Sequence, residues 1–284
     1  MKRNFWFHIV LLCGSSLGAM AASQVNLKVK TFNVPGAQQT DVFAVNNSLM
    51  AVGAYTDGQG HHHGFALSGK KVATIDDPNG VDTYCFAVNN SGAIVGYYST
   101  SNFVAQAFLY QNGSFTDIGP SGSTGSQGLG INDSGEITGN FGDAQGVHGF
   151  LWDGTKYTTI DVPGALFTLG GAINNAGLMT EVWLDSDGDS ESSLYDGTNF
   201  TTINVPGAED SSATGINKSG DVVFSWEDDS DNYHGAVLHR GKFYNFDVPN
   251  SARTFAYGIN DHDVIVGAYT TSDNQNHQGF GATR

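Results

Sequence analysis

The stretch Thr159–Ala165 reads TIDVPGA, and it returns at Thr202–Ala208 as TINVPGA. Weaker copies occur four more times, so that every proline of the chain lies in a copy: Pro35, Pro78, Pro120, Pro163, Pro206 and Pro249. Successive prolines are 42 or 43 residues apart. A fixed period of this size indicates a repeat architecture, here with six repeats.

Each repeat predicts four short strands joined by tight turns. The first strand ends at the proline, and Gly or Asn follows it in five of the six copies, as a type II turn prefers. The second strand ends at an asparagine found in all six repeats: Asn46, Asn89, Asn132, Asn174, Asn217 and Asn260. This asparagine is expected to open a hairpin turn. Mostly small residues two and four positions before it indicate a crowded strand, which we place nearest the axis of the assembly.

The third and fourth strands carry two further sets of equivalent residues. Nine positions after each asparagine the third strand ends in an aromatic residue: Tyr55, Tyr98, Phe141, Trp183, Trp226 or Tyr269. The fourth strand opens with motifs such as His63-Gly64-Phe65 and His148-Gly149-Phe150. We place His234 and His277 at the same position as His63 and His148, with Gln106 and Glu191 in the other two repeats.

Six repeats of four strands predict an all-β fold, a six-bladed β-propeller. We expect the N-terminal strand, residues 26–34, to pair beside the last strand, near residues 277–283. This pairing would close the ring and leave no long exposed edge. An open β-solenoid is the alternative, but its repeats are usually shorter and need atypical caps.

The repeats resemble those of the HAF-repeat extracellular proteins of bacteria, which are named after a His-Ala-Phe motif. The matching pieces are His63-Gly64-Phe65, His148-Gly149-Phe150 and Ile131-Asn132-Asp133-Ser134-Gly135. The middle residue of the motif is mostly Gly in this chain. The resemblance extends over all six repeats and implies a secreted bacterial repeat protein. It implies no activity, so no catalytic residue is carried over.

The first 21 residues resemble a secretory signal peptide. Lys2 and Arg3 precede an apolar core, and Ala19-Met20-Ala21 is a small-residue cleavage site. We therefore expect a secreted or periplasmic protein whose single domain covers residues 22–284, with no membrane span after cleavage. The formal net charge is −16. An acidic surface repels phosphate backbones, so nucleic acid is not expected as a partner.

The repeat predicts which face of the ring carries a site. Antiparallel strands place the loops between the third and fourth strands on the same face as the proline crossovers, and recognition usually resides in such loops. On this face the candidate binding residues are Asp185, Asp187, Asp189, Glu191, Glu227, Asp228, Asp229 and Asp231, together with Trp183 and Trp226. Asp185, Asp187 and Asp189 also form a possible calcium site, because Ca²⁺ prefers several oxygen ligands from a flexible turn. The alternative is a solvated acidic loop, since the full calcium-loop pattern is missing.

Two sets of equivalent residues allow both a structural and a functional interpretation. The histidines can ligate a metal ion, but a repeated histidine far from its copies is more simply a repeated structural contact. The aromatic residues can stack on sugars or pack between blades. They share a strand face with apolar residues four positions earlier, which favours the core.

The expected function is non-enzymatic binding or adhesion, with an extracellular glycan or protein recognised through the loop face. No motif of a hydrolase, phosphate-binding or zinc-protease site is present in the sequence. A polysaccharide hydrolase or lyase is the first alternative, and it requires Asp, Glu or His side chains that converge in the central funnel. A structural envelope protein without a ligand is the second. No cofactor is expected, apart from the possible calcium ion.

Overall fold

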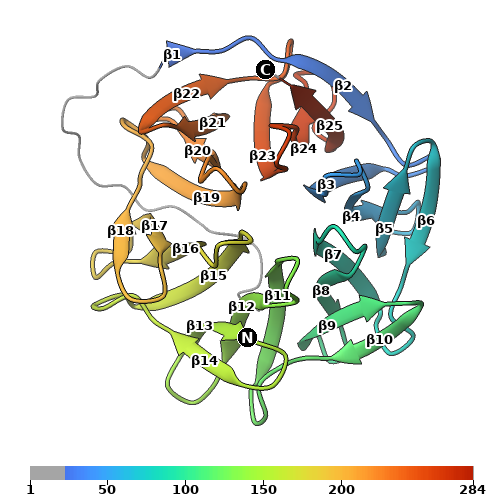
Figure 1. Cartoon of the computed structure of the whole chain (residues 1–284). Coiled ribbons are helices and arrows are strands. Elements are labelled where there is room, and N and C mark those ends of the chain that lie inside the picture. Colours follow the sequence, from blue (N-terminus) through green and yellow to red (C-terminus); the bar gives the residue numbers. More distant parts are fainter. Residues whose placement is uncertain (1–22, 284) are drawn as a thin grey trace.

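The computed structural model describes residues 23–283, which form six sheets arranged like blades around a central axis (Figure 1). A channel runs along this axis, lined by residues of all six innermost strands. The predicted six-bladed β-propeller is thereby confirmed, and the open solenoid is excluded. The proposed signal peptide at residues 1–21 lies outside the described residues.

Each blade contains four antiparallel strands, which we number from the axis outwards. The innermost strands are β3 (Gln39–Val45), β7 (Asp82–Val88), β11 (Gly125–Ile131), β15 (Phe167–Ile173), β19 (Asp210–Ile216) and β23 (Arg253–Ile259). The second strands are β4 (Ala51–Thr56), β8 (Ile94–Ser99), β12 (Ile137–Gly142), β16 (Met179–Leu184), β20 (Val222–Glu227) and β24 (Ile265–Thr270). The third strands are β5 (His62–Ser68), β9 (Ala105–Gln111), β13 (Val147–Trp152), β17 (Ser190–Tyr195), β21 (Tyr233–His239) and β25 (Gln278–Thr283). The outer strands are β6 (Lys71–Ile75), β10 (Ser114–Asp117), β14 (Tyr157–Ile160), β18 (Phe200–Thr202), β22 (Lys242–Phe246) and β2 (Lys28–Phe32).

The ring closes through the N-terminal part of the chain. β2 pairs antiparallel with β25 and so completes blade 6, whose other strands come from the C-terminal end of the chain. This is the predicted closure. A second contact was not predicted: β1 (Ser23–Gln24) pairs parallel with β22 and adds a fifth strand to blade 5 (Figure 1).

The six equivalent asparagines form a belt around one end of the channel. In Asn46 the side-chain oxygen accepts the backbone N–H groups of Ser48 and Met50, each at 3.0 Å. Its amide nitrogen donates to the carbonyl of Asn89 in the next blade, also at 3.0 Å. The same link to the next asparagine carbonyl recurs from Asn89, Asn132, Asn174 and Asn260, while Asn217 donates to the Asp263 carboxylate. The predicted turn is confirmed, and the side chain also ties neighbouring blades together.

A β-bulge interrupts every innermost strand three residues before its asparagine. In blade 1 the register shifts between Val42 and Ala44, which leaves Phe43 outside the ladder. Equivalent shifts occur in the other five blades. A bulge redirects the strand and its side chain, here towards the channel. The expected crowding beside it is confirmed, because a Cβ on Gly258 would lie 2.6 Å from the carbonyl oxygen of Phe43.

A large side chain fills the middle of every blade, but not always from the same strand. In blade 1 Phe65 on the third strand is fully buried over Gly53 on the second. In blade 5 the order is reversed, with Phe224 opposite Ala236. In blade 4 the corresponding pair is Glu181 and Ser193, so a carboxyl group takes the place of the aromatic ring. Glu181 is 1% exposed, and burial and the charge of Asp161 raise its pKa well above the usual value.

The two ends of the channel open on faces of different construction. The backbone N–H of Gln38 in the first crossover donates to the carbonyl of Thr56 at the end of β4, and this contact recurs in the other blades. The crossovers therefore lie on the same face as the loops between the second and third strands of each blade. These are the third and fourth strands of each sequence repeat, so the expected arrangement is confirmed. We name this shared face the loop face. The opposite side, which carries the asparagine turns, is the turn face.

Candidate functional site

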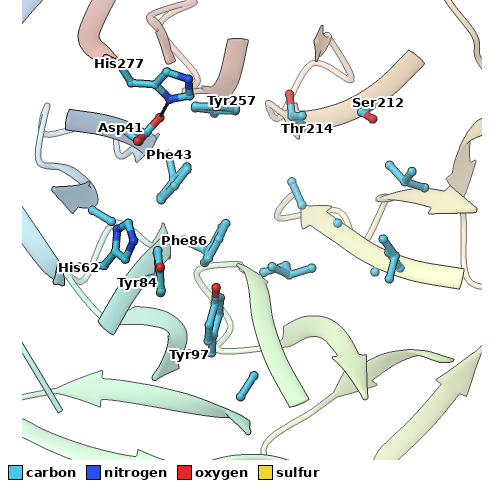
Figure 2. Close-up of a pocket in the computed structure, with 18 of the residues that line it drawn as sticks. Asp41, Phe43, His62, Tyr84, Phe86, Tyr97, Ser212, Thr214, Tyr257 and His277 are labelled. Carbon is cyan, nitrogen blue, oxygen red and sulfur yellow. Dashed lines mark hydrogen bonds and ion pairs between the residues drawn. The ribbon is translucent and has the colours of Figure 1, made fainter. Parts of the chain in front are cut away.

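A cavity of about 680 Å³ occupies the loop-face end of the central channel (Figure 2). It is lined by residues at the start of the innermost strands and at the bulges, and by side chains from the second and third strands behind them. At the turn-face end the channel narrows to a space of about 90 Å³. The propeller is therefore open to a small ligand mainly from the loop face.

One side of the cavity is an aromatic wall contributed by blades 6, 1 and 2. Its members are Tyr257, Phe43, Phe86, Tyr84 and Tyr97. Their rings contact one another in series, with 4.5 Å between the centroids of Phe43 and Phe86 and 4.8 Å between those of Tyr84 and Tyr97. Phe43 is also 5.2 Å from Tyr257. Five rings packed in this way hold one another in place, so the wall is preformed.

The other side of the cavity is formed by blades 3, 4 and 5 and has smaller side chains. They are Leu129, Leu169, Gly171, Ser212 and Thr214. Figure 2 shows Ser212 and Thr214 across the cavity from the labelled aromatic rings. Gly171 and Thr214 stand at the bulge, where blades 1 and 2 have phenylalanines. The empty space exists because half of the blades lack a ring at this position.

Asp41, His277 and Tyr257 form a polar corner where blades 6 and 1 meet (Figure 2). The Asp41 carboxylate lies 2.6 Å from Nδ1 of His277. A carboxylate only accepts hydrogen bonds, so Nδ1 carries the proton and, in the neutral ring, Nε2 is left as an acceptor. Burial, the charge of Asp41 and a hydrogen bond to it raise the pKa of Tyr257 well above its usual value. The corner thus presents a fixed carboxylate beside a neutral phenol.

His62 occupies the next junction, between blades 1 and 2. Its ring lies 5.1 Å from that of Tyr84, and its backbone N–H donates to the Asp82 carboxylate at 2.8 Å. Burial, together with the charges of Asp82 and Asp41, raises the pKa of Tyr84. Tyr84 is therefore also a neutral phenol at physiological pH, able to donate and accept.

The predicted acidic loop at Asp185–Glu191 lies on the loop face but outside the cavity lining. One oxygen of Asp185 accepts the backbone N–H groups of Asp187, Gly188 and Asp189, so this carboxylate closes its own turn. Asp187 is exposed, and Glu191 is hydrogen-bonded to Asn204 on the crossover to blade 5. Among residues 23–283, no three His, Cys, Asp or Glu side chains converge as a metal site. The calcium hypothesis stays a prediction, and a melting temperature insensitive to chelator would refute it.

The second predicted acidic segment is distributed over several environments. Asp228 accepts the backbone N–H groups of Ser230 and Asn232, whereas Asp229 and Asp231 are exposed. Glu227 is 2% exposed and directly opposite Asp210 on the neighbouring strand. Burial raises the pKa of Glu227, and the charges of Asp231 and Asp210 add to this. These four acids are also outside the cavity lining.

Trp183 and Trp226 each contact a side chain on the neighbouring strand of their own blade. Trp183 donates its indole N–H to the Ser193 hydroxyl at 2.8 Å, and Trp226 lies 4.7 Å from the ring of His234. Trp226 also packs against the buried cluster around Phe224. This placement favours the core interpretation of the aromatic positions, and a binding role for the two tryptophans stays a prediction.

Three of the four histidines placed at one position of the repeat share a structural contact, as expected. The placement of the fourth, His277, at that position was wrong. His148 bridges Asp143 and Asp161, with its two ring nitrogens 3.3 and 3.0 Å from their carboxylates. His63 and His234 make the same double contact. In blade 6, however, Gln278 is the residue opposite Tyr269, so His277 corresponds to His62 instead. The error arose because His277 precedes the motif by one residue, which turns it towards the cavity.

The comparisons with known proteins identify the fold and leave the family open. No family model matches the chain, and no curated protein matches it. The resemblance to HAF-repeat proteins therefore stays a prediction. The solved structure of the SapL1 lectin in complex with alpha methyl fucoside is similar, with a TM-score of 0.57, 14% identity, and coverage of 88% of this chain and 95% of that one.

Two further structures are similar at the same low level of identity. The fucose-recognising lectin of Aleuria aurantia, described as a six-bladed β-propeller, has a TM-score of 0.51 and 12% identity, covering 87% of this chain and 97% of the lectin. TolB from Acinetobacter baumannii has a TM-score of 0.59 and 10% identity, covering 82% of this chain and 63% of TolB. Likeness at this level of identity shows the six-bladed propeller fold.

Sequence reasoning did not identify the cavity residues, although the pattern contained a usable indication. Phe43, Phe86 and Tyr257 lie between two sets of small residues on the strand already placed nearest the axis. If the small residues face neighbouring blades, the large residue between them must face the channel. Regular strand alternation would instead direct this residue to the opposite face of the blade, and the sequence does not reveal the bulge that redirects it. Asp41 and His277 are brought together from opposite ends of the sequence, and only the closure of the ring predicts their contact.

Among the described residues there is no helix of the length and apolarity that crossing a membrane requires.

Proposed function

We propose that this protein binds carbohydrate non-enzymatically, with the loop-face cavity as its site. The observation that carries the proposal is the cavity itself, in which a wall of five aromatic rings lies beside a few fixed polar groups. A preformed, mostly apolar hollow with a small number of convergent polar groups is the usual form of a small-ligand site. Sugar rings combine an apolar face with a rim of hydroxyl groups, and the aromatic wall and polar corner supply both complements.

The similarity to lectin propellers supports the carbohydrate class without identifying the sugar. Of the similar structures, the SapL1 lectin is in complex with alpha methyl fucoside, and the Aleuria aurantia lectin is described by its fucose recognition mode. Methyl α-L-fucoside is therefore the first sugar to test. We further propose that the protein acts outside the cytoplasm as a secreted or periplasmic binding protein, on the basis of the signal-like residues 1–21.

A glycan array with the chain from residue 22 onwards tests this function. We expect binding that is lost in Ser212→Trp, because an indole at this position would fill the cavity from its small side. Ser219→Trp places the same side chain on an exposed turn of the opposite face and is the matched control. Glycan binding that survives Ser212→Trp would move the site out of the cavity. A chain that binds no glycan would contradict the proposal and favour a protein ligand or a structural role.

One observation favours an enzymatic alternative. The Asp41–His277 contact is the arrangement of a histidine base oriented by a carboxylate, and it lies in the central funnel. A polysaccharide lyase or hydrolase would use the Nε2 atom of His277 as its base. Incubation with polysaccharides followed by an assay for new reducing ends tests this alternative. Release of reducing ends that His277→Gln abolishes would establish it, and glycan binding without turnover would exclude it.

A further inference from the structure

We propose that the cavity selects neutral sugars over anionic ones, with Asp41 as the specificity-determining residue. The inference rests on the proposed glycan-binding function and adds the charge class of the ligand. It excludes uronic acids, sialic acids and sulfated sugars from the site. The argument uses the charges in the cavity, the way Asp41 is held and the asymmetry of the two cavity sides.

The lining of the cavity has a single charge when its two histidines, His62 and His277, are neutral. Among the described residues that line it, Asp41 supplies the one carboxylate, and none is Lys or Arg. Arg253 at the start of β23 is outside the lining; it is exposed and lies over the ring of Tyr233, 5.7 Å from its centroid. With neutral histidines, an anionic ligand would find no cationic partner in the lining. The formal net charge of −16 adds a long-range repulsion of anions.

Asp41 is held in a fixed orientation, which makes it suitable as a hydrogen-bond acceptor for a ligand. Nδ1 of His277 donates to Oδ1 at 2.6 Å, which fixes the carboxylate at the junction of blades 6 and 1. A carboxylate has about four acceptor positions, so this donor leaves capacity for ligand hydroxyl groups. Hydrogen bonds to a charged acceptor are about twice as strong as those between neutral groups. A sugar hydroxyl is a donor, whereas a ligand carboxylate would face Asp41 as a like charge.

The position of Asp41 is unique to its blade. At the equivalent position, five residues before each asparagine, the other blades have Tyr84, Gln127, Leu169, Ser212 and Phe255. The cavity therefore has one charged corner rather than six, and a ligand meets it in one orientation. Tyr257 in this corner and Tyr84 in the next blade are neutral phenols, because burial and the charge of Asp41 raise the pKa of both. They supply donors and acceptors that suit hydroxyl groups.

Matched sugar pairs test the selectivity in the unmodified protein. The probes are the methyl glycosides of glucose, galactose and mannose, each compared with its uronic acid, in which only C6 is oxidised. Calorimetric titration of the chain from residue 22 onwards should show the neutral member of the best pair binding at least about tenfold more tightly. This preference should persist at 1 M salt, since salt screens the distant surface charges and leaves a contact inside the cavity largely unscreened.

The variant Asp41→Asn tests whether Asp41 causes the selectivity for neutral sugars. We expect it to weaken binding of the neutral sugar by about tenfold, since the charged acceptor is lost, and to narrow the difference between sugar and uronic acid. Asp273→Asn is the matched control: it removes the same charge from an exposed position in the loop between β24 and β25, on the same face, and should leave the ratio unchanged. The melting temperature of each variant shows whether the fold is retained.

The outcomes separate this inference from the function on which it rests. Uronic acids that bind as tightly as the neutral sugars would overturn it and leave glycan binding intact. A preference that disappears in 1 M salt, or that Asp41→Asn leaves unchanged, would overturn the role of Asp41. If Asp41→Asn does not fold, the salt dependence of the unmodified protein still decides between contact and long-range repulsion. Absence of any saccharide binding would remove the proposed function and this inference together.

Discussion

The two ends of the central channel are built from the same six strands. They differ in how similar the residues at equivalent positions are from blade to blade. At the turn face all six blades have asparagine at one position, and five of the six amides make the same contact with the next blade. At the loop face the equivalent positions carry Asp41, Tyr84, Gln127, Leu169, Ser212 and Phe255, six different residues. A repeated residue indicates a contact that every blade needs. Divergence at one end of the same strands indicates where a ligand could be recognised.

Removing one link of the asparagine belt should have the largest effect on stability. Asn89→Ala removes one donor from the carbonyl of Asn132, which keeps the Gly135 N–H, and removes the acceptor of the backbone N–H groups of Ser91 and Ala93. Asn132 and Ala93 are buried and Ser91 is exposed, and several bonds are lost together, so we expect a loss of about 2–4 kcal/mol in the free energy of unfolding. This corresponds to a fall of roughly 5–10 °C in melting temperature.

Asn90→Ala is the control for the belt. Asn90 also bonds the neighbouring blades, to Asn47 and Asp133, but it is exposed and water can replace these contacts. We expect a loss below about 1 kcal/mol by calorimetry. Equal losses for Asn89→Ala and Asn90→Ala would remove the distinction between the buried belt and the ordinary turn contacts around it.

Replacing Glu181 should stabilise the protein in a pH-dependent way. Its pKa in the folded chain is raised, so folding retains a proton that the unfolded chain releases above its ordinary pKa of about 4.3. Stability therefore falls as pH rises from there towards the folded-state pKa. Glu181→Gln removes this dependence, and its advantage over the unmodified chain should grow between pH 5 and pH 8. Melting temperatures that differ by a constant amount across this range would contradict the assignment.

Removing one hydroxyl group from the cavity should affect ligand binding and leave stability nearly unchanged. Tyr257→Phe removes the phenol hydroxyl near Asp41 but keeps the ring in the aromatic wall. We expect glycan affinity to fall several-fold, with a change in the free energy of unfolding below about 1.5 kcal/mol, the usual net value of one hydrogen bond. Unfolding and binding measured on the same preparation check both numbers. A large loss of stability without loss of binding would make the loop-face end structural as well.

The smallest effect is expected from the histidines that bridge two aspartates. Burial lowers the pKa of His63, but its hydrogen bonds to Asp76 and Asp57 outweigh this and raise it; in His234 the bond to Asp247 is the main cause of the raised pKa. A raised pKa gives stability that is fully present below the unfolded-state value of about 6.5 and is lost as pH rises through the folded-state value. The double variant His63→Gln/His234→Gln should therefore differ from the parent more at pH 5.5 than at pH 8.5. Blades 2 and 6 already carry glutamine at this position, so folding should survive.

The sequence predicted the fold but did not reveal the cavity, for reasons that particular residues show. The proline and asparagine positions recur because each blade needs the same crossover and the same belt contact, so their period gives blade number, strand order and ring closure. The acidic segments near Asp185 and Asp228 were predicted as binding residues because many acids are close together in the sequence. In the structure one acid of each segment closes a turn, and others are exposed to solvent. A run of like residues in sequence is therefore a weak guide to convergence in space.

The amino-acid sequence by itself determined the six-bladed propeller, its closure by the N-terminal strand, and the face on which the variable loops lie. These features follow from local turn chemistry and from a period that every repeat shares. Only the tertiary structure decided which side chains meet at the axis. The contact between Asp41 and His277 spans almost the whole chain and depends on ring closure, and the direction of Phe43 and Phe86 depends on a bulge that strand alternation does not reveal. The cavity is a property of six blades together, and no single repeat encodes it.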